Sequence, residues 1–223
     1  MNLMAVGGHS IDLDLLPEAP LVLDVGCRYF NFSSELLNLR PNARVICLDP
    51  ALDIVEVPDD SRITFFRKAL VETDQSSVWL TWEGDGSRAS LEPEPGVLCG
   101  LENLGGAVAV PTISFRKILS DFGCHFDLIK FDCEGSEFAI LENWPGPVAT
   151  QISVEFHDTW GSGLHDDSYF ENLFNRPLQD YHVIQHEATP AGNYGYWHAD
   201  TLLVLKAAKY LEDRYDNHCN HDH

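Results

Sequence analysis

The sequence has few positive charges. Its 223 residues contain 14 lysines and arginines against 35 aspartates and glutamates, which gives a formal net charge of −21. Nucleic acids and anionic membrane surfaces repel such a chain unless a local basic patch compensates, and the sequence contains no such patch. We therefore expect no nucleic-acid partner.

Long apolar runs are also absent, and none approaches the roughly 20 residues that a membrane-spanning helix needs. The first residues, Met1–Ala5, offer neither a basic segment nor an extended apolar one, so we expect no signal peptide. The six cysteines are scattered without a C-x-x-C pair, which favours free thiols in a reduced, cytoplasmic setting. Composition leaves the oligomeric state open.

Segments with strand and helix periodicity alternate along most of the chain, and the length fits one domain over residues 1–223. This alternation predicts an α/β fold with a mostly parallel sheet. The expected strands are residues 21–25, 44–48, 63–66, 126–131, 150–157, 181–185 and 201–205. The expected helices are residues 32–39 (capped by Ser33 and Ser34), 112–122 (capped by Thr112), 134–143 and 168–175.

Four segments fall outside this alternation. Residues 1–19 are expected to form a short lead with a helical turn near Ile11–Leu16, and residues 77–82 alternate like one half of a small hairpin. Residues 83–107 are rich in glycine and proline and are expected to form a loop or lid insertion. Residues 207–223 are expected to be a C-terminal helix or tail, whose histidine-rich end could bind a metal or stay unstructured.

The first predicted strand runs directly into Gly26, a helix and a second strand that ends at Asp49, which is a βαβ unit of the dinucleotide-binding type. Gly26 would let the backbone approach a ligand closely, and Asp49 would accept hydrogen bonds from ribose hydroxyls. A nicotinamide dinucleotide is disfavoured, because Arg28 and Asn31 replace the second and third glycines of G-x-G-x-x-G.

The most informative stretch is Phe126–Glu137. Lys130 and Asp132 stand two apart in an apolar strand, so their side chains share one face, as an ion pair or a site. Glu134 and Glu137 stand three apart, on one side of the first turn of the expected helix, where the macrodipole favours acids. Helix capping alone would explain the two glutamates. For the four residues together at the end of a strand we favour a ligand site.

These motifs together resemble the FkbM family of S-adenosylmethionine-dependent methyltransferases. The resemblance rests on Leu23–Gly26, Leu48–Pro50, Ala69–Leu70, Asp127–Glu137 and Val154–Glu155. It implies a Rossmann-like class I methyltransferase with a seven-stranded, mostly parallel sheet, helices on both faces and an antiparallel last strand. It also implies O-methylation of a small-molecule or glycan hydroxyl, with S-adenosylmethionine as cofactor.

The resemblance implies a cofactor site in the first half of the chain. Two positions depart from the family pattern: Phe30 stands where the family has a second glycine, and Arg28 where it usually has a small polar residue. Either Phe30 crowds the methionine end of the cofactor, or the loop takes another path. A degenerate methyltransferase fold that binds without catalysis is therefore the alternative. The implied cofactor-binding residues are Asp24, Gly26, Cys27, Arg28, Phe30, Asp49, Pro50, Ala69 and Leu70.

The catalytic groups are expected around Asp132, as base or positioning residue next to the transferred methyl group, with Lys130 keeping it ionised. Glu134, Glu155 and His157 would line the acceptor side, since Glu155 and His157 share one face of the neighbouring strand. These groups could also hold a divalent metal, which is not expected, and His157 could instead be a loop residue that bonds the backbone.

Overall fold

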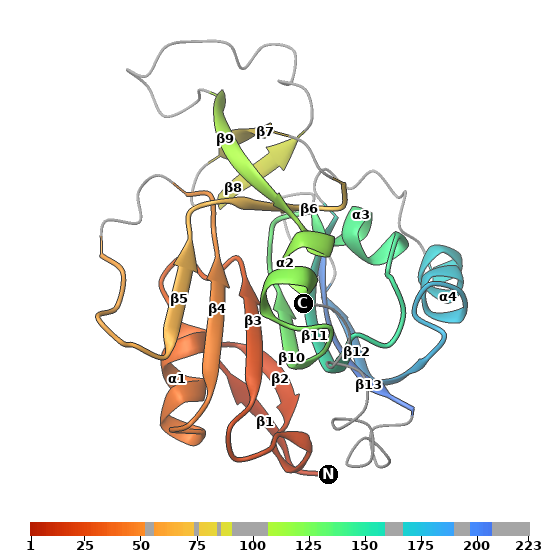
Figure 1. Cartoon of the computed structure of the whole chain (residues 1–223). Helices are drawn as coiled ribbons and strands as arrows, with labels where there is room; N and C mark the ends of the chain where they lie inside the picture. The colour runs from red at the N-terminus through yellow and green to blue at the C-terminus, as the bar shows by residue number, and fades with distance from the viewer. Residues whose placement is uncertain are drawn as a thin grey trace.

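The computed structural model describes residues 1–51, 56–73, 76–83, 86–90, 107–158, 167–189 and 197–206. Among these residues, seven strands form one large sheet (Figure 1). In spatial order they are β12 (Tyr181–Thr189), β13 (Trp197–Leu205), β11 (Ala149–Asp158), β10 (Phe126–Phe131), β3 (Leu21–Val25), β4 (Arg44–Leu48) and β5 (Ile63–Phe66).

The sheet is parallel except at β13, which pairs antiparallel with both β11 and β12. This confirms the predicted seven-stranded sheet with an antiparallel last strand. The chain runs from β3 outward to β4 and β5, and later from β10 outward to β11 in the opposite direction. The carboxyl ends of β3 and β10 therefore flank the point where strand order reverses, which is where open α/β sheets bind ligands.

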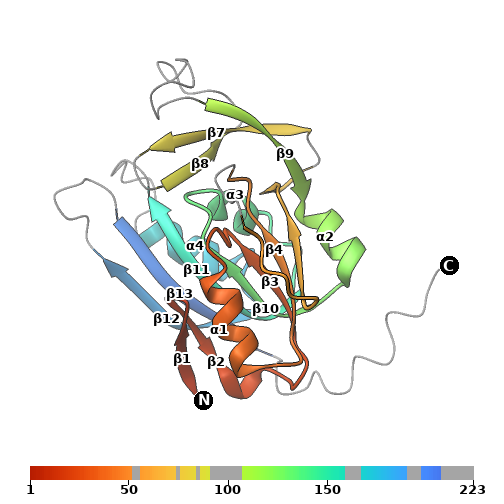
Figure 2. The ribbon, with the colours of Figure 1, turned by 90° about the vertical axis from the view of Figure 1, so that its left-hand side faces the viewer.

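Helices lie on both faces of the sheet (Figure 2). Successive side chains of a strand point to opposite faces, so each strand contributes to the packing on both sides. Val22 belongs to one buried apolar cluster and its neighbour Leu23 to the other. One cluster includes α1 (Asn31–Leu39) and the N-terminal strands; the other includes α2 (Phe115–Phe122), α3 (Glu137–Glu142) and α4 (Asp167–Asn175). The burial of these two clusters stabilises the sheet from both sides.

The N-terminal lead differs from the predicted helical turn. It forms a hairpin of β1 (Leu3–Val6) and β2 (His9–Asp12), followed by a short 3₁₀ turn over Leu13–Leu15. The hairpin is fastened to the sheet by Gln151 of β11, whose side chain accepts a hydrogen bond from Asp12 N at 2.7 Å and donates one to Asp12 O at 2.9 Å. Apolar periodicity carries no signal for such a contact.

A second, smaller sheet lies beyond the carboxyl ends of the main strands (Figure 1). The predicted hairpin at residues 77–82 is confirmed, since β7 pairs antiparallel with β8. The predicted loop over residues 83–107 is wrong for residues 86–90, which form β8; residues 91–106 lie outside the described part. The strands of this sheet are β6 (Ala69–Val71), β9 (Ala107–Ser114), β7 (Ser77–Glu83) and β8 (Gly86–Ser90).

Three helix starts also differ from expectation. Thr112 lies in β9, and Ser114 caps α2 by accepting a hydrogen bond from Lys117 N at 3.2 Å. The residue that precedes α1 is Phe30, which offers no side-chain cap, and Ser33 is buried inside the helix. The third helix begins at Glu137 rather than Glu134. The tail, residues 207–223, lies outside the described residues.

Candidate active site

A cavity of about 270 Å³ opens at the carboxyl ends of β3, β4 and β10, beneath the small sheet. It brings together most of the residues that the sequence indicated, although they come from four distant segments. Of the expected site residues, its walls contain Gly26, Cys27, Arg28, Asp49, Pro50, Ala69, Leu70, Lys130, Asp132 and Glu134. Asp24, Phe30, Glu155 and His157 are not on these walls.

Gly26 makes the turn after β3 with a φ of +77°, and its N–H donates to Leu48 O at 2.8 Å. A β-carbon built on it would lie 1.7 Å from the carbonyl oxygen of Asp132. The glycine is therefore required by the contact between the ends of β3 and β10, in addition to any approach of a ligand.

Phe30 does not reach the cavity. Its ring is buried and meets Phe65 edge to face, with 5.5 Å between the ring centroids, in the apolar cluster beside α1. Its backbone is left-handed, with a φ of 57°, a conformation that glycine adopts freely and phenylalanine at a cost of about 1 kcal/mol. The ring therefore packs away from the cavity, which supports the second alternative, that the loop takes another path.

Asp49 is held rigidly on the cavity wall. One carboxylate oxygen accepts from Arg28 N at 2.9 Å and the other from Ala51 N at 2.8 Å. Burial raises the pKa of Asp49, while these two hydrogen bonds oppose the shift. Each oxygen keeps a further lone pair that can accept from a ligand hydroxyl.

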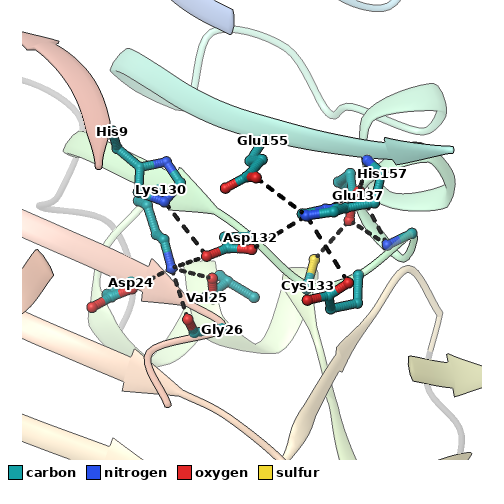
Figure 3. A network of polar contacts seen from close by, with 12 residues as sticks. His9, Asp24, Val25, Gly26, Lys130, Asp132, Cys133, Glu137, Glu155 and His157 are labelled. Carbon is teal, nitrogen blue, oxygen red and sulfur yellow. Dashed lines mark hydrogen bonds and ion pairs between the residues drawn. The ribbon is translucent and has the colours of Figure 1, made fainter. Parts of the chain in front are cut away.

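Lys130 is 3% exposed and neutralises two carboxylates at once (Figure 3). Its Nζ lies 3.3 Å from Asp24 Oδ1 and 3.4 Å from Asp132 Oδ2, and it donates to Gly26 O at 2.7 Å. Burial alone would lower the pKa of Lys130, but the two carboxylates raise it above its ordinary value. The predicted ion pair is confirmed, and it also ties β10 to the glycine turn.

Asp24 does not contact the cavity. It is fully buried behind the glycine turn, where its Oδ2 accepts a hydrogen bond from Ser33 Oγ at 2.5 Å. Together with the contact to Lys130, this joins α1, β3 and β10. Asp24 therefore supports the cavity floor from beneath.

Asp132 occupies the centre of the polar network (Figure 3). Its Oδ2 faces Lys130 and also His9 Nε2, at 3.5 Å, while its Oδ1 lies 3.9 Å from His157 Nε2. Burial would raise the pKa of Asp132, but the hydrogen bond from His9 and the charges of Lys130 and His157 lower it well below its usual range. The side chain is thus kept as a carboxylate.

His157 lies in β11, not in a loop, with carboxylates on both sides of its ring. Its Nδ1 is 3.3 Å from Glu137 Oε1, and its Nε2 is 3.4 Å from Glu155 Oε1 and 4.0 Å from Glu134 Oε2. Burial would lower the pKa of His157, but hydrogen bonds with Glu137 and Glu155 raise it to about 11. Burial and neighbouring carboxylates raise the pKa of Glu134, whereas the hydrogen bond to His157 lowers that of Glu155.

Two residues of this network were not among the expected site residues. His9 reaches Asp132 from the N-terminal hairpin, and nothing near it in the sequence indicates that contact. Glu137 had a signal, as the last acid of the Glu134–Glu137 motif, for which a solvated helix start and a place in the ligand site were both considered. It is fully buried, and its side chain accepts from Gly135 N at 2.9 Å and from His157 N at 2.7 Å.

The mostly parallel sheet with one antiparallel strand, and a glycine-turn cavity at its switch point, is the architecture of a Rossmann-like class I methyltransferase. The chain belongs to the FkbM methyltransferase family: the model described as "Methyltransferase FkbM domain" matches residues 26–181. A comparison with curated proteins found no match.

Solved structures with related folds include three methyltransferase-fold proteins of low identity. TrmK of M. capricolum, in complex with S-adenosylhomocysteine, is 10% identical with a TM-score of 0.46, over 88% of this chain and 69% of that one. The fibrillarin pre-rRNA processing protein of Methanococcus jannaschii is 8% identical with a TM-score of 0.47, over 87% and 70%. Precorrin-6y C5,15-methyltransferase of Geobacter metallireducens is 12% identical with a TM-score of 0.44, over 86% and 82%.

All three TM-scores lie below 0.5, so the family assignment rests on the family model and the architecture on the strand order. Within the described residues, no helix has the length and apolar character needed to cross a membrane.

Proposed function

We propose that this protein transfers a methyl group from S-adenosylmethionine to a hydroxyl group of a small-molecule or glycan acceptor. The observation that carries the proposal is that one cavity, in a chain of the FkbM family, joins the glycine turn and Asp49 to Asp132. A nucleoside site and a group suited to hold an acceptor hydroxyl thereby share one space.

The residues of the cavity fit the proposed cofactor. Asp49, fixed by two backbone N–H groups, would accept hydrogen bonds from the ribose hydroxyls. Ala69 and Leu70 offer an apolar wall for the adenine, and the turn from Gly26 to Arg28 lies beside the methionine end. S-Adenosylmethionine supplies an electrophilic methyl group when bound. The protein's own part is to hold the acceptor oxygen in line with it and exclude water.

Asp132 is our candidate for the group that contacts the acceptor hydroxyl. It lies on the cavity wall, and its side chain is 30% exposed. Lys130 and His9 both contact its Oδ2 and so set its orientation. A carboxylate held this firmly can orient a hydroxyl by accepting its hydrogen bond. Glu134, 40% exposed, would line the acceptor side of the same cavity.

The main reason to consider a non-catalytic binding module was Phe30. Because its ring packs against Phe65 in the core, we favour catalysis over that alternative.

Calorimetric titration with S-adenosylmethionine and S-adenosylhomocysteine tests the proposal. We expect one site with micromolar affinity for each, equivalent to about −8 kcal/mol, and no heat with NAD. Transfer of a radiolabelled methyl group to a panel of hydroxylated small molecules and glycans then identifies the acceptor. Binding of NAD instead would overturn the proposal in favour of a dehydrogenase, and binding of neither would favour a module without this cofactor.

A further inference from the structure

We infer that Asp132, Glu134 and His157 bind one divalent cation of the Mg²⁺ or Mn²⁺ type at the edge of the cofactor cavity. The ligand atoms are Asp132 Oδ1, Glu134 Oε2 and His157 Nε2. The site itself stands on these residues alone; the role given to the ion below rests on the proposed function.

The three ligand atoms lie close together, and small inward movements of their side chains would let them share a single ion. Two ligands that each lie about 2.1 Å from an ion are about 3.0 Å apart when adjacent and about 4.2 Å apart when opposite. His157 Nε2 lies 3.9 Å from Asp132 Oδ1 and 4.0 Å from Glu134 Oε2, and the three ligand atoms lie within 4.8 Å of one another. Glu134 is the most exposed of the three, so its side chain can rotate to close the remaining gap.

The two oxygens of Asp132 have different partners, which leaves one of them for the ion (Figure 3). Oδ2 faces Lys130 Nζ at 3.4 Å and His9 Nε2 at 3.5 Å. Oδ1 points the other way, toward His157. Lys130 therefore fixes the carboxylate from behind, while its charge is shared with Asp24.

His157 is oriented as metal-ligating histidines usually are, with a carboxylate on the ring nitrogen that faces away from the metal. Glu137 Oε1 lies 3.3 Å from Nδ1. The Glu137 carboxylate accepts hydrogen bonds from Gly135 N, His157 N and Cys133 Sγ. Because a carboxylate can only accept, Nδ1 also carries a hydrogen and donates it to Glu137. Nε2 faces Asp132, Glu134 and Glu155, and it would give up its hydrogen when an ion binds.

The chemistry of the surrounding groups selects a hard cation. Carboxylate oxygens outnumber the single imidazole nitrogen, since Glu155 Oε1 lies 3.4 Å from His157 Nε2 and can serve as a further ligand. The thiol of Cys133 donates a hydrogen bond to Glu137 at 3.4 Å. Around the proposed site, carboxylate side chains outnumber positively charged ones, and a divalent ion would compensate the excess negative charge.

The ion would act on the acceptor. Asp132 and Glu134 line the cavity, so an ion that they hold would lie beside the space proposed for the acceptor hydroxyl. A divalent cation would lower the pKa of that hydroxyl. The hydroxyl proton would pass to water, and the oxygen would form its bond to the methyl carbon as the carbon–sulfur bond of the donor breaks.

Titration with Mn²⁺, followed by the loss of the free-ion electron paramagnetic resonance signal, tests the site without any need for activity. We expect Glu134→Gln and His157→Asn to weaken one Mn²⁺ site at least ten-fold, while Glu171→Gln, an exposed acid on α4, leaves it unchanged. Thermal melting confirms that the variants are folded. S-Adenosylhomocysteine affinity, measured in parallel, is expected to be the same in the native protein and in Glu171→Gln.

Histidines near the C-terminus, His218, His221 and His223, could bind added metal, so the difference between native protein and variants decides the outcome. Equal Mn²⁺ binding by native protein, Glu134→Gln and His157→Asn would overturn the metal site. If S-adenosylhomocysteine still binds in that case, the proposed methyl transfer stands without a cation. If Mn²⁺ binds as expected but the nucleoside does not, the metal site stands and the proposed function fails.

Discussion

Gly26 and Asp132 touch so closely that a β-carbon on the glycine would lie 1.7 Å from the carbonyl oxygen of the aspartate. The contact joins the ends of the two central strands and so fixes the floor of the cavity. Gly26→Ala must displace one of these two backbone segments. We expect it to lower the free energy of unfolding by at least about 2 kcal/mol and to abolish S-adenosylhomocysteine binding.

Gly146→Ala is the matched control for this prediction, because Gly146 also has a positive φ of +115° but no atom within 4 Å of an added β-carbon. It should lose only about 1–2 kcal/mol for the backbone conformation and keep full affinity. Urea denaturation and calorimetry measure both quantities. Normal cofactor affinity in Gly26→Ala would show that the contact does not shape the site.

Phe30→Gly separates a backbone effect from a packing effect. Glycine relieves the left-handed backbone by about 1 kcal/mol. Loss of the buried ring against Phe65 costs about 3–5 kcal/mol, so we expect a net destabilisation of about 2–4 kcal/mol in urea denaturation. Affinity for S-adenosylhomocysteine should change less than about three-fold. Clearly tighter binding would mean that the ring does crowd the cofactor.

Asp49→Ala should weaken S-adenosylhomocysteine binding by about 1.5–3 kcal/mol, because the ribose hydroxyls lose a charged acceptor. A stability loss of about 1–2 kcal/mol should accompany it, since Arg28 N and Ala51 N lose their partner. Asp60→Ala removes a comparable contact to Arg62 N away from the cavity and should leave affinity unchanged. Equal affinities in the two variants would place the ribose elsewhere.

Asp132→Asn keeps the shape of the side chain but removes its charge. We expect it to bind cofactor nearly as the native protein does and to slow methyl transfer, once an acceptor is identified, by about 100-fold or more. Lys130→Met provides the structural comparison, because it leaves Asp24 and Asp132 without their buried cation and should cost about 3–5 kcal/mol of stability. A transfer rate per folded molecule within a few-fold of native in Asp132→Asn would restrict the residue to a structural role.

His125 should make stability depend on pH below neutrality. Burial lowers the pKa of His125, which bonds Thr150 Oγ1 at 2.9 Å and Pro147 O at 3.2 Å. The folded state therefore binds its proton less readily than the unfolded chain, whose pKa is about 6.5. The stability contribution is complete above about pH 6.5 and is lost as the pH falls through the lower folded-state pKa. Urea denaturation at pH 7.5 and 5.5 should show a smaller loss for His125→Gln than for the native protein; equal losses would contradict this.

The main sheet could be predicted because each of its central strands is a mainly apolar run that is followed by a glycine or an acid. The Lys130–Asp132 pair was predictable for the same reason, since two charges at period-2 spacing in such a run must share a face and compensate each other. Both inferences use only neighbours in sequence.

The rest of the site depends on contacts between distant segments. His9 reaches Asp132 only because Asp12 and Gln151 dock the hairpin, and no local pattern encodes that. Glu137 follows Glu134 at helical spacing, and only the left-handed residues Glu134 and Gly135 delay the helix and turn Glu137 inward. The sequence left two alternatives open for Phe30, because family spacing indicates a glycine but not where a replacing side chain will point.

The two hydrogen bonds between Asp12 and Gln151 impose an order on the folding of the chain during its synthesis. The two residues are separated by 139 positions, and His9, on the same hairpin, completes the surroundings of Asp132. During synthesis the earliest strands must therefore wait, unpaired with the sheet, until β11 has emerged from the ribosome. A chain interrupted before β11 would therefore leave its hairpin undocked and the backbone groups of Asp12 without their partner, Gln151.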